Sequence, residues 1–237
     1  RLFPFVGSLD GAPGVAYDGG TLMTQTSLKA ALRAAQNNTG DPRIGSAALI
    51  GPMLRHIGAL DSELRDDLIY GTFNRWIAED RIGDDALRSM LGALIGVDYL
   101  FHRIDSPAYA CVFKRSFSTL LIALIVDRHN RRPLLNADSL RRVEAALLDY
   151  YAAERIVAGY YPKEGWAHSV ANAADAFVVL LEAGLCSPES IRPLLDLIGR
   201  KFSHNRCSFV NGEDDRTAPI VQQILTNYPM LREEDLV

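Results

Sequence analysis

The sequence predicts an all-α protein, and three observations lead to that prediction. From Thr24 onward, apolar residues recur at three- and four-residue spacing, the period of a helix buried along one side. No stretch alternates apolar and polar residues between hairpin turns, so no sheet is expected. Glycine, proline and short polar residues mark where helices begin and end. With 237 residues, 48% of them hydrophobic, the chain has ample material for a core.

The markers divide the chain in order. Residues 1–24 are rich in glycine and proline, which predicts an irregular N-terminal arm. Residues 25–237 are expected to form a single helical-repeat domain. Within it, helices are expected over residues 42–58, 61–78, 84–95, 107–129, 136–150, 165–183, from 188 onward, and 214–227.

Individual boundaries have local causes. Ser106-Pro107 and Ser187-Pro188 each place a capping hydroxyl before a proline, the residue suited to the first helical position. Asn136 is expected to cap the helix that follows it, and Gly184 to end the helix before it. The apolar run Leu120–Val126 is too short to span a bilayer, so it is expected to lie in the core and not in a membrane.

A weak internal sequence repeat favours a repeat architecture. Leu87-Arg88, Leu140-Arg141 and Ile191-Arg192 each follow a polar cap by a few residues, at spacings of 53 and 51 residues. A second helix follows each of them. This pattern is typical of an α-solenoid built from helix pairs, although a non-repeating helical bundle would give a similar periodicity.

Three local strings, in this order, support the same architecture. They are Phe113–Phe117 (FKRSF), Gly165–Ser169 (GWAHS) and Gly212–Arg216 (GEDDR). Together they resemble an uncharacterised bacterial family annotated only as a domain of unknown function, over about residues 40–230. The resemblance implies a HEAT- or armadillo-like right-handed α-solenoid of about four helix pairs. It implies no activity. The family commonly has a second histidine where this chain has Asn172, so any metal held by such a pair is expected to bind weakly here.

Composition excludes several classes of partner. The formal charge is −4, and no block of Lys and Arg is longer than two residues, so nucleic acid is not an expected partner. The three cysteines are far apart and form no zinc framework, which favours a reducing, cytoplasmic compartment. No cofactor is expected.

The candidate site lies in the expected helix over residues 165–183. His168, Asn172 and Asp175 stand at positions i, i+4 and i+7, so they would project from one face of an otherwise apolar helix. An unpaired buried polar group costs roughly 1–3 kcal/mol, so this stripe needs partners. It is therefore either a structural hydrogen-bond network or a functional site.

Other polar residues could share a groove with this stripe. In a curved stack of helix pairs, one helix of each pair lines the concave face. Glu213 would lie at the rim of that groove, and Glu154 and Tyr160 in or beside the preceding loop. The candidate binding residues are Arg115, Tyr161, Trp166, His168, Asn172, Asp175, Glu213, Asp214 and Arg216.

Three interpretations of this set remain open. A metal site would need His168 and Asp175 to lean together across two helical turns, with Glu213 or Asp214 completing the ligands. A hydrolase-like enzyme would use His168 as a proton carrier with Asp175 or Glu213, although no activated nucleophile is visible.

The third interpretation is a buried polar clasp. Arg115 or Arg216 would pair with Asp175 or Glu213, His168 and Asn172 would bond backbone ends of neighbouring helices, and Trp166 would anchor the core. The acidic pairs Asp66-Asp67 and Glu79-Asp80, and the run Glu233–Asp235, are expected to lie on solvated faces or at helix ends.

The preferred prediction is a soluble helical-repeat binding or scaffold protein. Its concave face near Trp166 would hold an unknown protein segment or a small polar ligand. The enzyme that uses His168 is the alternative.

Overall fold

The computed structural model describes residues 22–37, 46–182, 184, 186–203 and 208–228. The arm predicted over residues 1–24 and the acidic run Glu233–Asp235 lie almost wholly outside this part of the chain. The elements are α1 Gln25–Gln36, α2 Ser46–Arg55, η2 Glu63–Tyr70, α3 Gly71–Ala78, α4 Asp84–Leu94, α5 Ala110–Arg131, α6 Ala137–Ala153, β1 Tyr160–Tyr161, β2 Gly165–Trp166, α7 Ser169–Glu182, α8 Pro188–Ser203 and α9 Glu213–Asn227.

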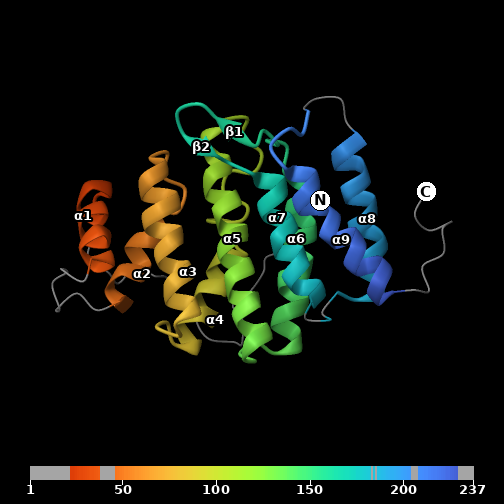
Figure 1. Cartoon of the computed structure of the whole chain (residues 1–237), viewed down its shortest axis with the longest axis horizontal. Coiled ribbons are helices and arrows are strands. Elements are labelled where there is room, and N and C mark those ends of the chain that lie inside the picture. The colour runs from red at the N-terminus through yellow and green to blue at the C-terminus, as the bar shows by residue number, and fades with distance from the viewer. Residues whose placement is uncertain (1–21, 38–45, 183, 185, 204–207, 229–237) are drawn as a thin grey trace.

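Neighbouring helices in the sequence pack in a regular order. Helices α1, η2 with α3, α5, α7 and α9 lie side by side in one row, each in contact with the next (Figure 1). Helix α4 packs on α5, α6 packs on α7, and α8 packs on α6. The prediction of a mostly helical protein is confirmed.

Helices α5 and α7 form the centre of the molecule. Helix α5 is buried on nearly every side, and Leu121, Ile122, Ile125 and Val126 of its apolar run lie in the core, as predicted. Helix α7 presents buried alanines, whose small side chains let the two helices pack closely. Among the described residues, no helix has both the length and the apolar character to cross a bilayer.

Several predicted boundaries are confirmed by cap geometry. The Asn136 side chain accepts a hydrogen bond from Ser139 N at 2.8 Å and so caps α6. Helices α4, α8 and α9 begin within a residue of their predicted positions. The helix expected over 61–78 is present, but its first half, η2, is a π-helix with wider turns. The helix expected from Pro107 begins only at Ala110, because Ser106 Oγ accepts from Ala108 N in a turn instead.

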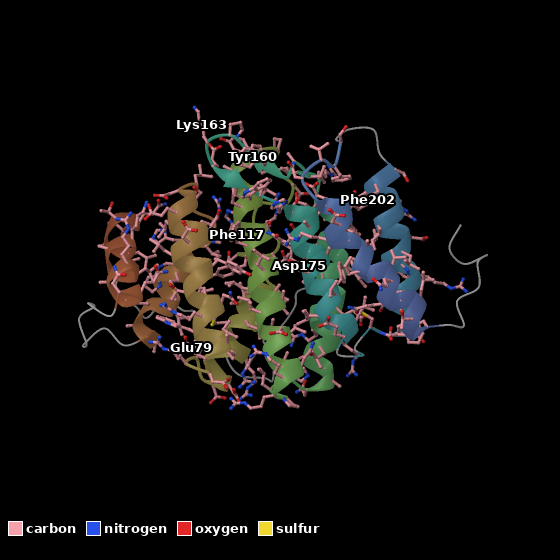
Figure 2. All side chains as sticks on the ribbon, in the orientation of Figure 1. Glu79, Phe117, Tyr160, Lys163, Asp175 and Phe202 are labelled. Atoms are coloured by element: carbon pink, nitrogen blue, oxygen red, sulfur yellow. The ribbon has the colours of Figure 1, made fainter. Side chains whose placement is uncertain are left out.

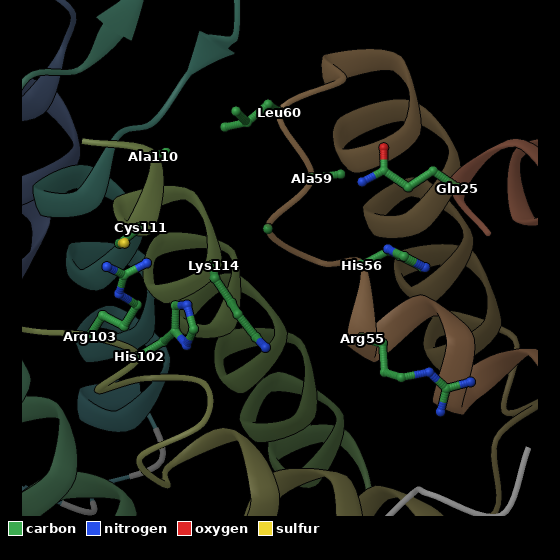
Figure 3. Close-up of a pocket in the computed structure, with 11 residues that line it drawn as sticks. Gln25, Arg55, His56, Ala59, Leu60, His102, Arg103, Ala110, Cys111 and Lys114 are labelled. Atoms are coloured by element: carbon green, nitrogen blue, oxygen red, sulfur yellow. The ribbon is translucent and has the colours of Figure 1, made fainter. Parts of the chain in front are cut away.

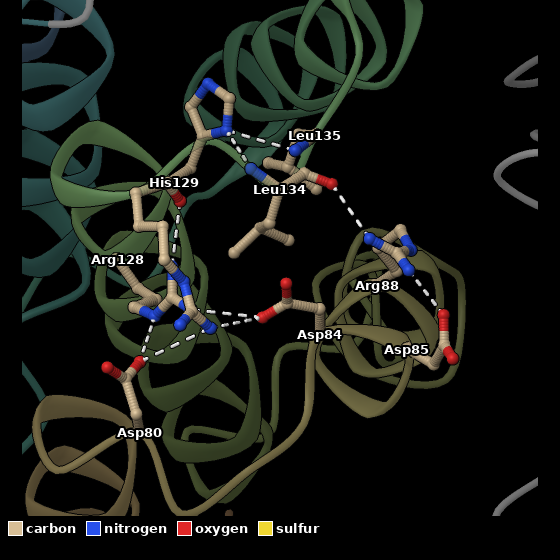
Figure 4. A network of polar contacts seen from close by, with 9 residues as sticks. Asp80, Asp84, Asp85, Arg88, Arg128, His129, Leu134 and Leu135 are labelled. Carbon is tan, nitrogen blue, oxygen red and sulfur yellow. Dashed lines mark hydrogen bonds and ion pairs between the residues drawn. The ribbon is translucent and has the colours of Figure 1, made fainter.

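A buried arginine in the last turn of α5 joins the α3–α4 connection to the α5–α6 connection. Arg128 of α5 donates to Asp80 at 2.5 Å and to Asp84 at 3.0 Å, and its Nη1 donates to the Arg132 carbonyl (Figure 4). His129 Nδ1 accepts from Leu134 N and Leu135 N, both at 3.0 Å. Asp80 is exposed just after the end of α3, as predicted, and it also compensates a guanidinium that is almost fully buried.

The prediction of a helix from residue 165 and of no sheet is also wrong. Strands β1 and β2 form a short antiparallel hairpin in which Tyr160 faces Trp166 and Tyr161 faces Gly165. Gly165 has φ 82° and His168 has φ 46°, and both values lie outside the helical region. The first helical hydrogen bond runs from Asn172 N to the His168 carbonyl, so α7 starts after His168.

Candidate functional site

The strongest polar contact near the predicted site is a buried ion pair between α5 and the end of α6. Arg115 Nε and Nη2 donate to the two carboxylate oxygens of Glu154 at 2.7 and 2.8 Å, and both side chains are buried. Arg115 Nη1 donates to the His102 carbonyl at 3.0 Å, and Glu154 Oε1 also accepts from Ile156 N at 2.9 Å. Arg115 is therefore structural. Its partner is Glu154, so Arg115 is not the arginine that pairs with Asp175 or Glu213 in the clasp interpretation.

The backbone of Glu154 holds a second buried cation, Lys201. Its Nζ donates to the Glu154 carbonyl at 2.8 Å and lies 5.0 Å from the centroid of the Tyr151 ring. Burial lowers the pKa of Lys201 to about 8, although Glu154 opposes this effect.

This shifted pKa predicts a pH dependence of stability. Below about pH 8 Lys201 is protonated in the folded chain, and its buried charge lowers the free energy of unfolding. Above that pH, folded Lys201 loses its proton while the unfolded chain keeps one, so stability rises with pH up to the ordinary lysine pKa. Urea unfolding should show the stability of the wild type relative to Lys201→Met rising by about 2–3 kcal/mol between pH 8 and 10.5. A stability difference between the wild type and Lys201→Met that stays constant from pH 8 to 10.5 would contradict a buried Lys201 charge. The control is Lys163→Met, because Lys163 is exposed and its loss should add no such pH dependence.

A chain of hydrogen bonds links α5, α7 and α9 beside this pair. Ser116 Oγ donates to the Ala167 carbonyl, and Asn172 Nδ2 donates to Ser116 Oγ at 2.7 Å. Arg216 Nη2 in turn donates to Asn172 Oδ1 at 2.7 Å. Asn172 is thus fully engaged within the protein. It bonds a neighbouring side chain and not the helix end that the clasp interpretation expected.

Arg216 completes the chain with a partly exposed ion pair. Its Nε donates to Asp175 Oδ1 at 3.1 Å, and its Nη2 donates to Asp175 Oδ2. This is one of the pairings that the clasp interpretation included. Figure 2 places Asp175 on the face of α7, below the hairpin that carries Tyr160.

His168 differs from these engaged residues. Its imidazole stacks flat on the Trp166 ring, with centroids 4.6 Å apart and an interplanar angle of 4°. The His168 side chain is 16% exposed, and its Nδ1 lies 4.0 Å from Glu213 Oε1, beyond hydrogen-bond distance. Burial and then Arg216 lower the pKa of His168, whereas Glu213 and Asp175 raise it. At neutral pH this imidazole is therefore mostly uncharged.

Glu213 lies behind His168 and not at a rim. Its side chain is 1% exposed. Its Oε2 accepts from Asn211 N at 2.9 Å, whereas neither Oε1 nor His168 Nδ1 has a hydrogen-bond partner in the described protein. A Cβ at Gly159 would overlap Oε1 and Asn211, so only glycine lets the chain pass this close. The fold thus places a buried carboxylate next to a half-buried imidazole.

The hairpin carries an exposed aromatic surface over this pair. Trp166 is 46% exposed, so the prediction that it anchors the core is wrong, and its ring contacts Tyr160 at a centroid distance of 4.7 Å. On the other side of the hairpin, Tyr161 stacks on Tyr109 at 4.7 Å and packs against Phe113. We call Tyr160, Trp166 and His168 the Trp166 surface.

The structure divides the predicted residues into three groups. Arg115 and Asn172 belong to internal contacts, and Tyr161 packs between neighbouring rings. Trp166, His168 and Glu213 come together, with Asp175 and Arg216 beside them. Asp214 is exposed in the first turn of α9. Among the described residues, no group of three or more His, Cys, Asp or Glu side chains is arranged to hold a metal ion.

Sequence reasoning missed three residues in this region. Glu154 and Tyr160 were placed only in or beside the loop, and the hairpin position of Tyr160 gives it its exposure. Arg65 was given no role by the sequence, yet it donates to the Glu164 carbonyl at 2.7 Å and so holds the hairpin loop. No local pattern marks that contact, because its partners are 99 residues apart.

The chain was compared with known proteins. The family model described as "Protein of unknown function (DUF2785)" matches residues 100–236, more than half of the chain. This range includes every candidate residue named above. No curated protein matches the chain, and no solved structure matches it either.

Proposed function

The chain belongs to the DUF2785 family of proteins of unknown function, and we propose that it is a helical-repeat binding or scaffold module that holds a protein segment on the Trp166 surface. A small polar ligand is the other outcome that the experiment below can return. The observation that carries the proposal is the exposed Trp166 ring, stacked on an imidazole whose Nδ1 bonds nothing in the described protein.

The helix order supports the repeat architecture that this proposal assumes. Helices α3, α5, α7 and α9 follow one another in a row, with α4 and α6 packed against the same row (Figure 1). A HEAT-like right-handed solenoid of about four helix pairs would arrange its helices this way and leave one row as the concave face. The Trp166 surface would then lie along the edge of that row, above α5 near its middle (Figure 1).

The chemistry of the surface suits a peptide-like partner. Exposed tryptophan and tyrosine are the residues most enriched where protein partners bind, because a large rigid ring loses little entropy when it is covered. The partly exposed Asp175 and Arg216 lie nearby and offer a charged rim. A neutral His168 can accept a hydrogen bond through its second ring nitrogen.

The test uses the two tryptophans of the chain. Trp76 is buried and Trp166 is exposed, so the Trp76→Phe variant leaves Trp166 as the only fluorescent indole. Peptides selected from a displayed random library against the wild type would be titrated into this variant. We expect them to shift Trp166 emission saturably. Trp166→Ala lacks this indole, so its affinity is measured by isothermal titration calorimetry beside the wild type, and it should be weaker by about 30-fold, the effect of losing a hot spot of about 2 kcal/mol.

The control is an exposed apolar residue elsewhere. Leu225 is about as exposed as Trp166, and Leu225→Ala should leave the affinity unchanged. Peptides that bind Trp166→Ala as tightly as the wild type would contradict the proposal. A titration in which only small polar metabolites shift the emission would assign the site to a small ligand.

A second function is favoured by the His168–Glu213 pair. A buried carboxylate next to an imidazole is the arrangement that orients a general base for hydrolysis. The neighbouring serines are occupied, because Ser116 donates to Ala167 and Ser169 donates to the Ile156 carbonyl, so a water molecule would have to be the nucleophile. Turnover of a chromogenic ester panel that is lost in His168→Ala would favour this enzyme over the binding module.

A further inference from the structure

A pocket separate from the Trp166 surface lies between the end of α2 and the start of α5. Its volume is about 350 Å³. One wall is the end of α2 with the chain that follows it, and the other is the first turns of α5 with residues 102–103 (Figure 3). This pocket contains none of the residues of the Trp166 surface, so its role is independent of the function proposed above.

The pocket is lined by positive charge. Arg55, Arg103 and Lys114 contribute three cations, and His56 and His102 contribute two imidazoles, whereas none of the described residues that line it is acidic. The chain as a whole carries a formal charge of −4, so this concentration of cations is not a reflection of average composition.

Among these cations, Lys114 packs against an aromatic ring and not against a carboxylate. Its Nζ lies 4.7 Å from the centroid of the Tyr99 ring, and no carboxylate of the described residues lies within ion-pair distance of it. Burial lowers the pKa of Lys114, and Asp98 offsets only part of that effect. Burial also lowers the pKa of His102, and the charges of Lys114, Arg103 and Arg115 lower it further. The His102 ring thus lies in a positive field, and Lys114 carries the cost of a partly buried charge; a bound anion would relieve both.

The backbone holds these side chains in place. At Gly58 the α2 wall approaches α5 so closely that a Cβ would lie 2.5 Å from Lys114 Cβ and 2.7 Å from its Cα. The His102 carbonyl is fixed by Arg115, and His56 Nε2 lies 3.0 Å from the Met23 carbonyl. Arg103 adopts φ 47°, a left-handed conformation that is strained for any residue except glycine and often found at functional sites.

We propose that this pocket binds a small phosphate-bearing molecule. Arginine and lysine together form the usual protein environment for phosphate oxygens. The pocket is larger than one phosphate ion needs, and its volume is in the range of small-molecule sites. A phosphate ester therefore fits it better than the free ion.

The test follows His102 by NMR while inorganic phosphate, glycerol phosphate or succinate is added at constant ionic strength. Phosphate and glycerol phosphate should shift the His102 ring signals saturably and raise its pKa, with the ester binding at least as tightly as the ion. Lys114→Met keeps the length of the side chain and removes its charge, so it should weaken binding by about tenfold or more. The matched control Lys163→Met removes the same charge from an exposed position and should change nothing.

A second variant separates binding from folding. Arg103→Gly removes a pocket cation and also relieves the positive-φ strain, so it should bind phosphate less tightly while melting at the same temperature as the wild type or higher. The proposal would be overturned if phosphate gave no saturable shift at His102, or if Lys163→Met weakened binding as much as Lys114→Met. Tighter binding of succinate than of both phosphates would exclude a phosphate site. Trp166 emission should stay unchanged throughout, which keeps this result distinct from that of the peptide experiment.

Discussion

Replacing Arg115 with leucine should lower the free energy of unfolding by about 3–5 kcal/mol. The substitution leaves the Glu154 carboxylate buried without its cation and the His102 carbonyl without its donor. Leucine fills part of the volume but supplies no hydrogen bond, so the cost of a buried uncompensated charge dominates. Urea unfolding followed by far-UV circular dichroism measures the change.

A double variant tests whether this cost comes from the pair. Arg115→Leu combined with Glu154→Leu removes both charges, so it should be less destabilised than the sum of the two single variants, with a coupling of about 1–3 kcal/mol. The matched control is Arg141→Leu, because Arg141 pairs with Asp138 at an exposed position and its loss should cost at most about 0.5 kcal/mol. An Arg115→Leu variant as stable as this control would disprove the structural role of the pair.

The parts of the fold that the sequence predicted are those with local causes. The apolar run in α5 identifies the central helix, because a helix that is hydrophobic on all sides must be buried. Asn136 caps α6 through an atom three residues away, and Pro188 opens α8 at the position its fixed backbone suits. Each of these features depends only on residues that are close together in the sequence, so the sequence alone can reveal it.

The parts that could not be predicted depend on distant partners. The polypeptide from Gly159 to Trp166 forms a hairpin because Tyr160 pairs with Trp166 and Arg65 bonds the loop from elsewhere in the chain. The apolar periodicity predicted that the next helix begins at residue 165, because the segment Gly165–His168 contains one glycine and no other residue that would end a helix. His168 therefore lies before α7 and not on its polar face.

The partners of the charged residues also depend on distant parts of the chain. Asp66 and Asp80 were expected on solvated faces or at helix ends, and Asp80 is indeed exposed just after α3. Each also compensates a buried arginine, Arg65 or Arg128, and only the tertiary structure reveals that arginine's burial. The pair of Arg216 with Asp175 was one of the pairings that the sequence suggested. For Arg115 the sequence suggested Asp175 or Glu213, whereas its partner in the structure is Glu154.

Replacing Arg65 with leucine should have an effect of similar size and should also act on the candidate site. Arg65 is fully buried and donates to the Ala59 carbonyl at 2.8 Å and to the Glu164 carbonyl at 2.7 Å. Its guanidinium carbon lies 4.3 Å from the centroid of the Phe113 ring, and its Nε lies 2.7 Å from Asp66 Oδ1. Losing these contacts together should cost about 3–5 kcal/mol.

The pH dependence of this loss distinguishes a missing cation from a simple packing defect. Burial already raises the pKa of Asp66, and Arg65 opposes that rise, so the variant should raise it further. An aspartate with a raised folded pKa binds its proton more readily in the folded chain, so stability is recovered as pH falls toward the ordinary aspartate pKa. The gap in stability between Arg65→Leu and the wild type should therefore narrow from pH 7 to pH 5. A packing defect alone would leave that gap constant.

Amide hydrogen exchange in the hairpin measures the local effect of Arg65→Leu. Ala167 N and His168 N both donate to the Gly159 carbonyl, and Arg65 holds the loop that brings these groups together. Their amide protons should exchange faster in Arg65→Leu, even under conditions where the variant is fully folded, and Trp166 should lose affinity for any peptide that it binds. Arg65→Lys keeps the charge but not the planar fork of donors, so it should restore only part of the stability. Unchanged exchange at Ala167 and His168 in Arg65→Leu would mean that the hairpin holds the Trp166 surface without Arg65.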